Sequence, residues 1–322
     1  MTGVRYVAAA AALMLGHGIA TAQSYPVKSI RIVVPYPAGG GTDITARPIA
    51  ARLSEKWGVS IVIDNRGGAT GMIGAELVAR APADGYTLLL SAASEVALNV
   101  ALFPKMSYDP VKDLQPITLA TVTPAIFVVH PSLPVKTVKE FVALARSRPG
   151  QIAYASVGTG SPQHFSGELL KLLATVDITH IPFKGAAPAL IDVLGGHVPS
   201  GFIALLPAIP HVKAGRLVPL AVSSKKRASA LPEVPAMSEV GYPDFDISQW
   251  FAAWAPAGTP KEIVDRLNTE MVAIIRSPDY QKRMTEQGTD AVGGTAAELG
   301  AFQRAEIEKY RRIARDAKIK GE

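Results

Sequence analysis

The stretch VVPYPAGGGTDITAR, residues 33–47, joins two patterns that decide the fold. A short apolar run ends at two prolines, three consecutive glycines follow, and apolar side chains then recur at helical spacing. A strand that passes through such a loop into a helix leaves backbone N–H groups unpaired at the helix start, where they can bind an anion. The loop therefore predicts a site for a nucleotide phosphate, a catalytic oxyanion or the carboxylate of a small solute.

The loop fits neither common nucleotide-binding motif. A P-loop needs Lys and then Ser or Thr after its last glycine, whereas Gly41 is followed by Thr42 and Asp43. The dinucleotide motif, started at Gly39, requires glycine where the chain has Ile44. Asp43 suits the positive end of the helix dipole but would repel a polyphosphate. A carboxylate site remains, and the alternative is a tight turn whose glycines serve backbone geometry alone.

Composition narrows the function classes. The chain has 322 residues, of which 48% are hydrophobic, a size that favours two domains over one. It contains no cysteine, which excludes disulfides, thiolate metal sites and cysteine nucleophiles. The formal net charge is +6, but the basic residues are scattered, which argues against nucleic acid and favours attraction of anionic solutes. No sequence pattern predicts a cofactor or a metal site.

The first 22 residues, MTGVRYVAAAAALMLGHGIATA, have the pattern of a secretory signal peptide. Arg5 gives the positive start, residues 7–15 are apolar, and residues 20–22 read Ala-Thr-Ala, a small-x-small cleavage pattern. The alternative is a short buried helix. Removal of Arg5 lowers the net charge from +6 to +5. The sequence thus predicts an exported, periplasmic protein whose mature chain starts near Gln23.

Hydrophobic periodicity predicts two strand–helix series. In the first, we expect strands at residues 29–34, 59–64 and 86–90, and helices at residues 42–57 and 71–80. This alternation indicates a parallel sheet. A long extended stretch at residues 114–131 follows, and then the second series, with helices at 138–148, 161–174 and 186–194 and strands at 152–156, 178–183 and 217–224. The chain ends with an extended segment at 247–256 and helices at 260–276 and 296–317.

The return to strand and helix after the second series suggests an interrupted domain. We predict an α/β protein of two lobes, with lobe 1 formed by residues 23–122 plus 224–322 and lobe 2 by residues 123–223. Two extended segments, near residues 121–125 and 222–224, would cross between the lobes. The cleft between two such lobes is a favoured ligand site.

A second loop resembles the first. ASVGTGSPQHFSGELL, residues 155–170, again follows a strand and opens a helix without a P-loop lysine. Gly158 and Gly160 leave N–H groups accessible, and Thr159 and Ser161 add hydroxyls. Two such loops at the carboxyl ends of strands would suit a solute with a carboxylate at one or both ends. His164, in the first turns of this helix, either hydrogen-bonds the solute or caps and packs the helix.

Other candidates are single residues at strand ends. Ser91 and Ser94 follow the third strand and are predicted to face the cleft. Lys184 and Gly185 follow a strand of lobe 2, where the lysine would attract an anion or lie exposed. No metalloprotease or nucleophile-elbow motif occurs, although a catalytic triad depends on geometry rather than on sequence spacing.

The chain resembles the Bug receptors, the periplasmic solute-binding proteins of tripartite tricarboxylate transporters. The similarity covers the mature chain, and these segments carry it: YPVKSIRIVVPYPAGGGTDITAR, ADGYTLLL, LNVALFPKMSYDPVKDLQPITL, IAYASVGTGSPQHFSGELL, IPFKGAAPALIDVLGGHV, LAVSSKKRASALPEVPAMSEVGY and WAPAGTPKEIVDRLNTE.

The resemblance implies a periplasmic-binding-protein type II fold that closes on a small organic acid. By position, it assigns the carboxylate site to Tyr36, Ala38, Gly39 and Gly40 of the first loop and to Gly158, Thr159, Gly160 and Ser161 of the second. Thr42, which follows the glycines of the first loop, is a further candidate. It also implies a monomer that docks on a membrane permease. One departure concerns Pro199 and Ile203, where the family usually has aspartates. If position 203 faces the cleft, an apolar-bodied acid is favoured over an amino acid.

These observations predict a solute-binding protein without catalytic activity that delivers a small carboxylate to a permease. Two alternatives remain open. One is a secreted α/β hydrolase of a carboxylic ester or amide, which requires a nucleophile with a base in reach. The other is a sensor subunit that presents the solute to a membrane partner.

Overall fold

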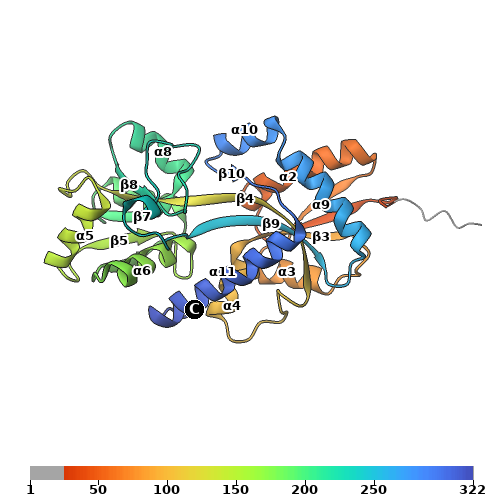
Figure 1. Cartoon of the computed structure of the whole chain (residues 1–322), viewed down its shortest axis with the longest axis horizontal. Coiled ribbons are helices and arrows are strands. Elements are labelled where there is room, and N and C mark those ends of the chain that lie inside the picture. Colours follow the sequence, from red (N-terminus) through yellow and green to blue (C-terminus); the bar gives the residue numbers. More distant parts are fainter. Residues whose placement is uncertain (1–24, 322) are drawn as a thin grey trace, which may run out of the picture.

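The computed structural model describes residues 25–321, so the predicted signal peptide lies outside the described residues. Figure 1 shows an elongated molecule with a group of strands and helices at each end and two long strands between them. Within residues 25–321, ten strands form one continuous sheet, and no helix combines the length and apolar character needed to cross a bilayer. The sheet runs in the order β2-β1-β3-β9-β4-β7-β5-β6, with β8 and β10 also paired to β4.

The first half is built on a parallel core. Its strands are β1 (Ile30–Val34), β2 (Ile61–Asn65) and β3 (Thr87–Ala92), with β2 and β3 parallel to β1. The connecting segments contain the helices α2 (Gly41–Trp57) and α3 (Met72–Ala79). The helical turns η1 (Ala69–Gly71) and η2 (Ser94–Leu98) and the short helix α4 (Asn99–Leu102) lie beside them. The predicted parallel sheet is therefore confirmed.

Two long strands connect the halves. β4 (Leu114–Val129) pairs antiparallel with β9 (Ser248–Pro256) along residues 114–124. Residues 125–129 of β4 pair instead with β7 (Ser200–Ala204) and β8 (Val218–Val222). One strand thus belongs to both parts of the sheet, and Figure 1 shows β4 and β9 side by side across the middle of the molecule.

The second half repeats the organisation of the first. Its parallel strands β5 (Ala153–Ser156), β6 (Thr179–Pro182) and β7 alternate with helices. These helices are α5 (Val138–Ser147), α6 (Pro162–Ala174), α7 (Ala186–Leu194) and α8 (Leu205–Lys213). The carboxyl ends of β1 and β5 therefore open into glycine-rich loops that lead to α2 and α6.

The last part of the chain returns to the first half. It contains η3 (Met237–Val240), α9 (Lys261–Ile275), α10 (Pro278–Glu286), β10 (Asp290–Ala291) and α11 (Ala296–Asp316). α11 lies against β4, η2, α4 and α6. On α11, the ring of Tyr310 packs edge-on against Phe165 of α6, with ring centroids 4.9 Å apart. The C-terminal helix thus contacts both halves (Figure 1).

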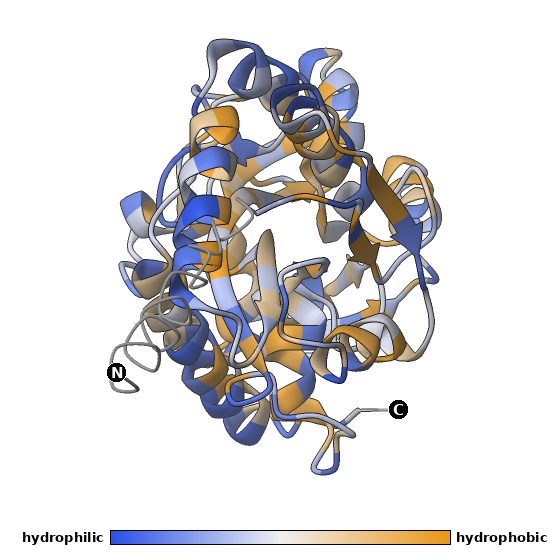
Figure 2. Cartoon of the chain, turned by 90° about the vertical axis from the view of Figure 1, so that its right-hand side faces the viewer, coloured by the Kyte–Doolittle hydropathy of each residue, from blue (hydrophilic) through white to orange (hydrophobic). Residues whose placement is uncertain are grey.

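Hydrophobic burial follows this arrangement. Figure 2 shows hydrophobic strands in the interior and hydrophilic residues on the outward faces of the helices. One buried cluster is continuous between the halves, since it contains Leu89, Phe127, Phe165 and Trp250. Two further clusters lie on the other face of the sheet, around Leu53 in the first half and around Val193 in the second.

The predicted elements match the observed ones to within a few residues. The elements β7, α8 and α10 were not predicted, nor were the short elements α4 and β10 and the turns η1, η2 and η3. β7 follows Pro199 and contains Gly201, and α8 contains Pro207 and Pro210, so local propensity argued against both. α10 is a short helix just after α9. These elements form because tertiary packing outweighs propensity.

The division into lobes stays a prediction, and core packing suggests a different second boundary. Ala228, Leu231, Val234 and Ala236 join the buried cluster of the second half. Ser223 is bonded through its backbone C=O to the N–H of Ile247. Core packing therefore favours a boundary near residue 247 rather than residue 224.

Candidate functional site

A cleft of about 710 Å³ lies where the two glycine-rich loops face each other. One wall comes from the loop between β1 and α2, the opposite wall from the loop between β5 and α6, and β9 contributes Gln249 and Phe251. The lining residues are Tyr36, Pro37, Ala38, Gly40, Gly41, Thr42, Thr70, Ala92, Ser94, Asn99, Leu102, Phe103, Val157, Gly158, Thr159, Gly160, Ser161, Pro162, Gln163, Gln249, Phe251, Lys320 and Gly321.

The first wall presents an uncapped helix start. Gly40 is the N-cap of α2 and no side chain caps the helix. The backbone N–H groups of Gly41 and Thr42 have no hydrogen-bond partner among the described residues. Both residues line the cleft. Free N–H groups at the positive end of a helix dipole favour an anion at this position.

Asp43 shapes this loop rather than opposing an anion. Its carboxylate accepts a hydrogen bond from Gly39 N–H at 2.9 Å and pairs with the guanidinium of Arg47. Asn65 donates to Asp43 at 3.1 Å and to the C=O of Tyr36 at 2.9 Å. Burial opposes ionisation of Asp43, but these hydrogen bonds outweigh it and lower its pKa. The negative charge is therefore neutralised within the loop and its partners.

In the second wall, a histidine side chain accepts a hydrogen bond from the loop backbone. Gly160 donates its backbone N–H to Nδ1 of His164 at 3.1 Å, and Ser161 caps α6 by accepting from the N–H of His164. Ser161 also donates its own N–H to the C=O of Gly158. The N–H groups of Thr159 and Gln163, which also line the cleft, have no partner among the described residues.

The expected set of backbone donors is therefore wrong in detail. Gly39 and Gly40 of the first loop and Gly160 and Ser161 of the second were assigned to the carboxylate site, but the N–H groups of all four are already paired within their loops. The unpaired donors sit one to three positions away, at Gly41, Thr42, Thr159 and Gln163. Both predicted loops line one cleft, whereas no local sequence pattern indicates which side chains occupy their N–H groups.

His164 stacks on His180 behind the second loop, with ring centroids 3.9 Å apart. Burial, reinforced by the charge of Lys171, lowers the pKa of His164 to about 4. Burial and the neighbouring His164 likewise lower the pKa of His180 to about 4. Both rings are neutral near pH 7, as an Nδ1 that accepts from Gly160 requires. Of the two roles left open for His164, the packing role is the one observed.

A serine–histidine pair lies next to this stack. Ser156 Oγ and His180 Nε2 are 2.7 Å apart, which is the spacing of a nucleophile and its base. Ser156 is fully buried, however, and it does not line the cleft. Its hydroxyl accepts from the N–H of Gly158. The pair thus shapes the second loop and has no access to a solute.

Most of the predicted site residues line the cleft. They are Tyr36, Ala38, Gly40, Thr42, Ser94, Gly158, Thr159, Gly160 and Ser161. Gly39 and His164 do not line the cleft, but each takes part in a hydrogen bond that shapes its loop. Lys184 is exposed, and Gly185 is bonded through its N–H to the C=O of Val157, so both adjoin the second loop without lining the cleft.

Ser91 and Ile203 face away from the cleft, which corrects the two predictions. Ser91 is fully buried and accepts a hydrogen bond from Nε1 of Trp254 at 2.7 Å. Ile203 is fully buried in the cluster that contains Ile126 and Val193. Alternate residues of a strand point to opposite faces, and both side chains lie on the core side. The condition for preferring an apolar-bodied acid over an amino acid, that position 203 faces the cleft, is therefore not met.

Several cleft residues were not predicted because they come from distant parts of the chain. Lys320 reaches the cleft from beyond α11, where Lys318 has a left-handed backbone (φ 56°) and the N–H of Ile319 bonds the C=O of Ala314. Within residues 25–321, Lys320 is the only charged side chain that lines the cleft. No sequence pattern near the end of α11 indicates that Lys320 lies at the cleft.

A second cavity of about 250 Å³ adjoins the cleft and shares Gly41, Gln163, Gln249 and Phe251 with it. Phe251 therefore lies between the two spaces. The Oε1 atom of Gln163 is buried and has no hydrogen-bond partner among the described residues. The site thus carries at least one polar group that a bound molecule or water can satisfy.

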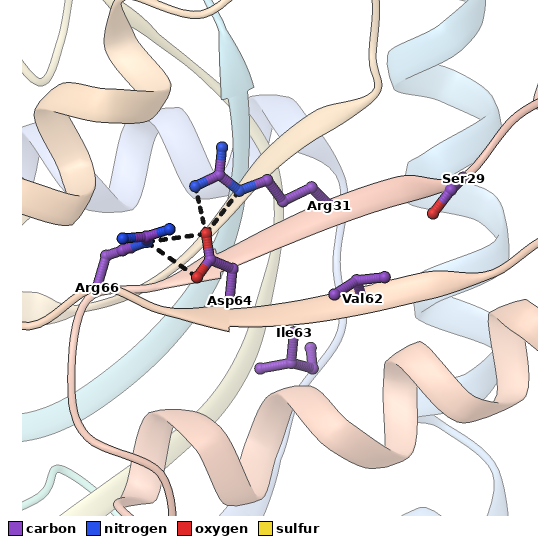
Figure 3. A pocket seen from close by; sticks show the side chains of 6 residues that line it. All are labelled: Ser29, Arg31, Val62, Ile63, Asp64 and Arg66. Carbon is purple, nitrogen blue, oxygen red and sulfur yellow. Dashed lines mark hydrogen bonds and ion pairs between the residues drawn. The ribbon is translucent and has the colours of Figure 1, made fainter.

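A further hollow of about 450 Å³ lies on the outer edge of the sheet, at β1 and β2. Figure 3 shows Arg31 and Arg66 pointing at Asp64 from either side. Burial opposes ionisation of Asp64, but hydrogen bonds from Arg66 and Arg31 lower its pKa. Its charged groups already satisfy one another, so this hollow offers less to a solute than the cleft does. Within residues 25–321, no group of acidic or histidine side chains is arranged to hold a metal ion.

Residues 45–319 match the model of the tripartite tricarboxylate transporter family receptor. The chain is 36% identical to protein BugT of Bordetella pertussis over 303 residues, which cover 93% of each protein. Among solved structures, it is similar to Rpa4515 of R. palustris with adipate, at 39% identity and a TM-score of 0.78, covering 92% of this chain and 99% of that one. MatC from Rhodopseudomonas palustris with bound malate matches at 32% identity and a TM-score of 0.72, covering 90% and 99%.

Proposed function

Because the chain belongs to the tripartite tricarboxylate transporter receptor family, we propose that its cleft captures a small organic carboxylate for delivery to a membrane permease. The observation that carries this proposal is the pair of opposed helix starts. Gly41 and Thr42 on one wall, and Thr159 and Gln163 on the other, present unpaired N–H groups to one cleft. Neutral backbone donors of this kind suit a single carboxylate better than a phosphate chain.

The rest of the lining fits an acid with an apolar middle. Leu102, Phe103 and Phe251 supply apolar surface, and Lys320 supplies a positive charge. No carboxylate side chain lines the cleft within residues 25–321, so a bound anion meets no like charge there. Related receptors have adipate and malate bound, both of which are dicarboxylates. A dicarboxylate would place one acid group at the N–H groups and the other near Lys320.

The remaining parts of the function are inferred from the family. We propose that the protein works in the periplasm, is exported by residues 1–22, and acts as a monomer that presents its solute to permease subunits. The large hydrophobic side chains exposed on the described surface, such as Val62, Ile73 and Ile191, belong to different elements. Scattered apolar residues of this kind are usual for a monomer. The protein catalyses no reaction in this proposal, because Ser156 and His180 lie outside the cleft.

The test is a thermal-shift screen followed by isothermal titration calorimetry. The screen compares adipate, malate and succinate with their diamides, which keep the shape but lose the charge. We expect at least one diacid to raise the melting temperature and its diamide to have no effect, since charge-assisted hydrogen bonds are about twice as strong as neutral ones. A purified, folded protein that binds no carboxylate, or that binds diamides equally well, would contradict the proposal.

A further inference from the structure

A buried acid lies directly behind the first loop. Glu95 is in η2, the π-helical turn that follows β3, and its side chain is fully buried. It does not line the cleft, whereas its neighbour Ser94 does. π-Helical turns are rare and occur often at functional sites. No part of the carboxylate-binding proposal so far uses this acid.

Both carboxyl oxygens of Glu95 have hydrogen-bond partners, and the backbone N–H of Glu95 itself also bonds its carboxyl group. Oε1 accepts from the N–H of Ala92 at 2.7 Å. Oε2 lies 2.9 Å from the hydroxyl oxygen of Tyr36, which lines the cleft. Gly71 covers this contact, because a Cβ at that position would lie 2.8 Å from Oε2 and 3.1 Å from the Tyr36 hydroxyl. Ser94 lines the cleft together with Tyr36 and acts to lower the Tyr36 pKa, although burial raises that pKa overall.

No cation compensates this acid. The titratable groups that face it are Tyr36 from the first loop and Tyr108, whose hydroxyl donates to the Glu95 C=O at 2.6 Å. The nearby charge on α3 is another acid, Glu76, which acts on Tyr108. From α11, the neutral Gln303 bonds the C=O of Val96. No ion pair to Glu95 exists within residues 25–321.

These surroundings favour the protonated acid. Burial raises the pKa of Glu95 to about 8, even though hydrogen bonds from its own backbone N–H, from the Ala92 N–H and from Tyr36 act in the opposite direction. Near pH 7 the carboxyl group then carries its own hydrogen. Oε1 is occupied as an acceptor of the Ala92 N–H, so the hydrogen is placed on Oε2, opposite the Tyr36 oxygen.

We propose that Glu95, as the neutral acid, donates its hydrogen to Tyr36 and so leaves the Tyr36 O–H to donate toward Ser94 and the carboxylate of the solute. The inference rests on the proposed function and deepens it, since it makes Glu95 a positioning residue for carboxylate binding. When Glu95 is ionised, its oxygen instead accepts the Tyr36 hydrogen, and the cleft loses that donor.

Solute binding is then linked to proton uptake. Above about pH 8 the empty protein has an ionised Glu95. Binding places one solvent proton on Oε2, and the Tyr36 hydrogen turns from Oε2 toward the cleft. The O–H bond formed at Oε2 uses a proton released by a buffer acid or water, and no other covalent bond is made or broken. The apparent dissociation constant should therefore be nearly constant below pH 8 and rise about tenfold by about pH 9.

The experiment measures adipate binding by calorimetry between about pH 6.5 and pH 9, in buffers with different ionisation enthalpies. The wild-type protein should take up almost no protons at the lower pH and about one proton per adipate at the upper pH. Glu95→Gln keeps both contacts, because the amide oxygen accepts from Ala92 and the amide N–H donates to Tyr36. This variant should bind without pH dependence and without proton uptake.

Two further variants complete the design. Tyr36→Phe removes the hydroxyl while Glu95 stays, so binding should be weaker at every pH and should lose its coupling to protons. Glu55→Gln, on the exposed surface of α2, is the matched control and should keep the wild-type pH profile. An infrared difference spectrum between the two pH values, wild type minus Glu95→Gln, shows the carboxylic acid signal directly and needs no solute.

The outcomes separate this inference from the proposed function. A wild-type affinity that does not change with pH, or a Glu95→Gln profile identical to the wild-type one, overturns the role of Glu95. If neither adipate nor any other acid of the screen binds at any pH, the proposed function fails. In that case the infrared spectrum still decides the protonation state, and an ionised Glu95 at pH 7 overturns the inference on its own.

Discussion

Gly160 donates its backbone N–H to Nδ1 of His164, so one ring nitrogen fixes the conformation of the second cleft loop. The ring must be neutral to accept this hydrogen bond. His164 in turn stacks on His180, whose Nε2 contacts the hydroxyl of Ser156. These contacts extend from the cleft wall into the core of the second half. Because they include two neutral histidines, they predict how the stability of the fold depends on pH.

We expect stability to fall as the pH drops from about 6.5 to 4. The pKa values of His164 and His180 are lowered to about 4 in the folded protein, so the unfolded chain binds more protons in this window and acid favours unfolding. Protonation of His164 would also remove the acceptor of the Gly160 N–H. The loss should be about 1–3 kcal/mol across the window.

Melting temperatures measured at several pH values test this expectation. His164→Asn places an amide oxygen near the position of Nδ1 and cannot be protonated, so its melting temperature should fall less steeply below pH 6.5. His197→Asn is the control, because His197 is exposed on the turn before β7. Equal slopes for the wild-type and His164→Asn proteins would show that this stack does not titrate.

Adjacent glycines of the first loop should respond differently to alanine. A Cβ at Gly41 would lie 2.8 Å from Cζ of Phe251, so the ring that separates the two cavities must move. A Cβ at Gly40 meets nothing closer than the C=O oxygen of Pro37 at 3.4 Å. Gly41→Ala should weaken binding about tenfold, about 1.4 kcal/mol, whereas Gly40→Ala should change it less than about threefold.

Circular dichroism and melting temperature establish whether both variants fold. Alanine is more favourable than glycine at Gly41, the first residue of α2, and less favourable than glycine at the N-cap, Gly40. Calorimetry with the acid identified in the screen then measures the two affinities. If Gly41→Ala binds as well as Gly40→Ala, the solute does not approach the start of α2, and the N–H groups of Gly41 and Thr42 are not its ligands.

Lys320 should add a modest, salt-dependent part of the affinity. Its side chain is exposed, so its attraction for an anion is screened by water and ions. Lys320→Gln should weaken diacid binding about two- to fivefold at low salt, and the difference should shrink at high salt. Lys318→Gln carries the same charge change two residues away, outside the cleft lining, and serves as the control.

Comparison of a diacid with its monoacid gives the second measurement for Lys320. We expect Lys320→Gln to weaken the diacid more than the monoacid, because only the diacid has an acid group left for the lysine. An equal loss for both acids would mean that Lys320 attracts anions in general and does not contact the distal group.

The loops were predictable from sequence, while the atoms that bind were not. A strand, a run of glycines and a helix start are neighbours in the chain, so the pattern at residues 33–47 is local and predicts the position of each loop. Which N–H groups stay free depends on Asp43 with Arg47 in one loop and on His164 with His180 in the other. These pairings arise only when side chains of several elements meet.

The sequence also could not predict which side chains point into the cleft and which point into the core. Ser91 and Ser94 are three residues apart, and no local sequence pattern distinguishes the directions of their side chains. Ser91 lies at the end of β3, where a shift of one residue reverses the side chain. Ser94 lies in η2 and faces the cleft. Ile203 was misassigned for the same reason, and Phe251 and Lys320 lie too far away in sequence for any local pattern to connect them to the loops.

These two serines provide the final prediction. Ser91→Ala removes the acceptor of the Trp254 Nε1–H, which lies in the core, and leaves a buried donor without its partner. We expect a loss of about 1–3 kcal/mol in the free energy of unfolding and no change in affinity. Ser94→Ala should have the opposite profile, with nearly unchanged stability and weaker binding, because Ser94 lines the cleft beside the Tyr36 hydroxyl.

Urea denaturation and calorimetry on the two variants measure both properties in parallel. A weaker affinity for Ser91→Ala at unchanged stability would place Ser91, rather than Ser94, at the solute. An unchanged affinity for Ser94→Ala would show that the Ser94 hydroxyl makes no contact that contributes to solute binding. Since the two substitutions delete the same hydroxyl three residues apart, any difference between them reports only which way each side chain faces.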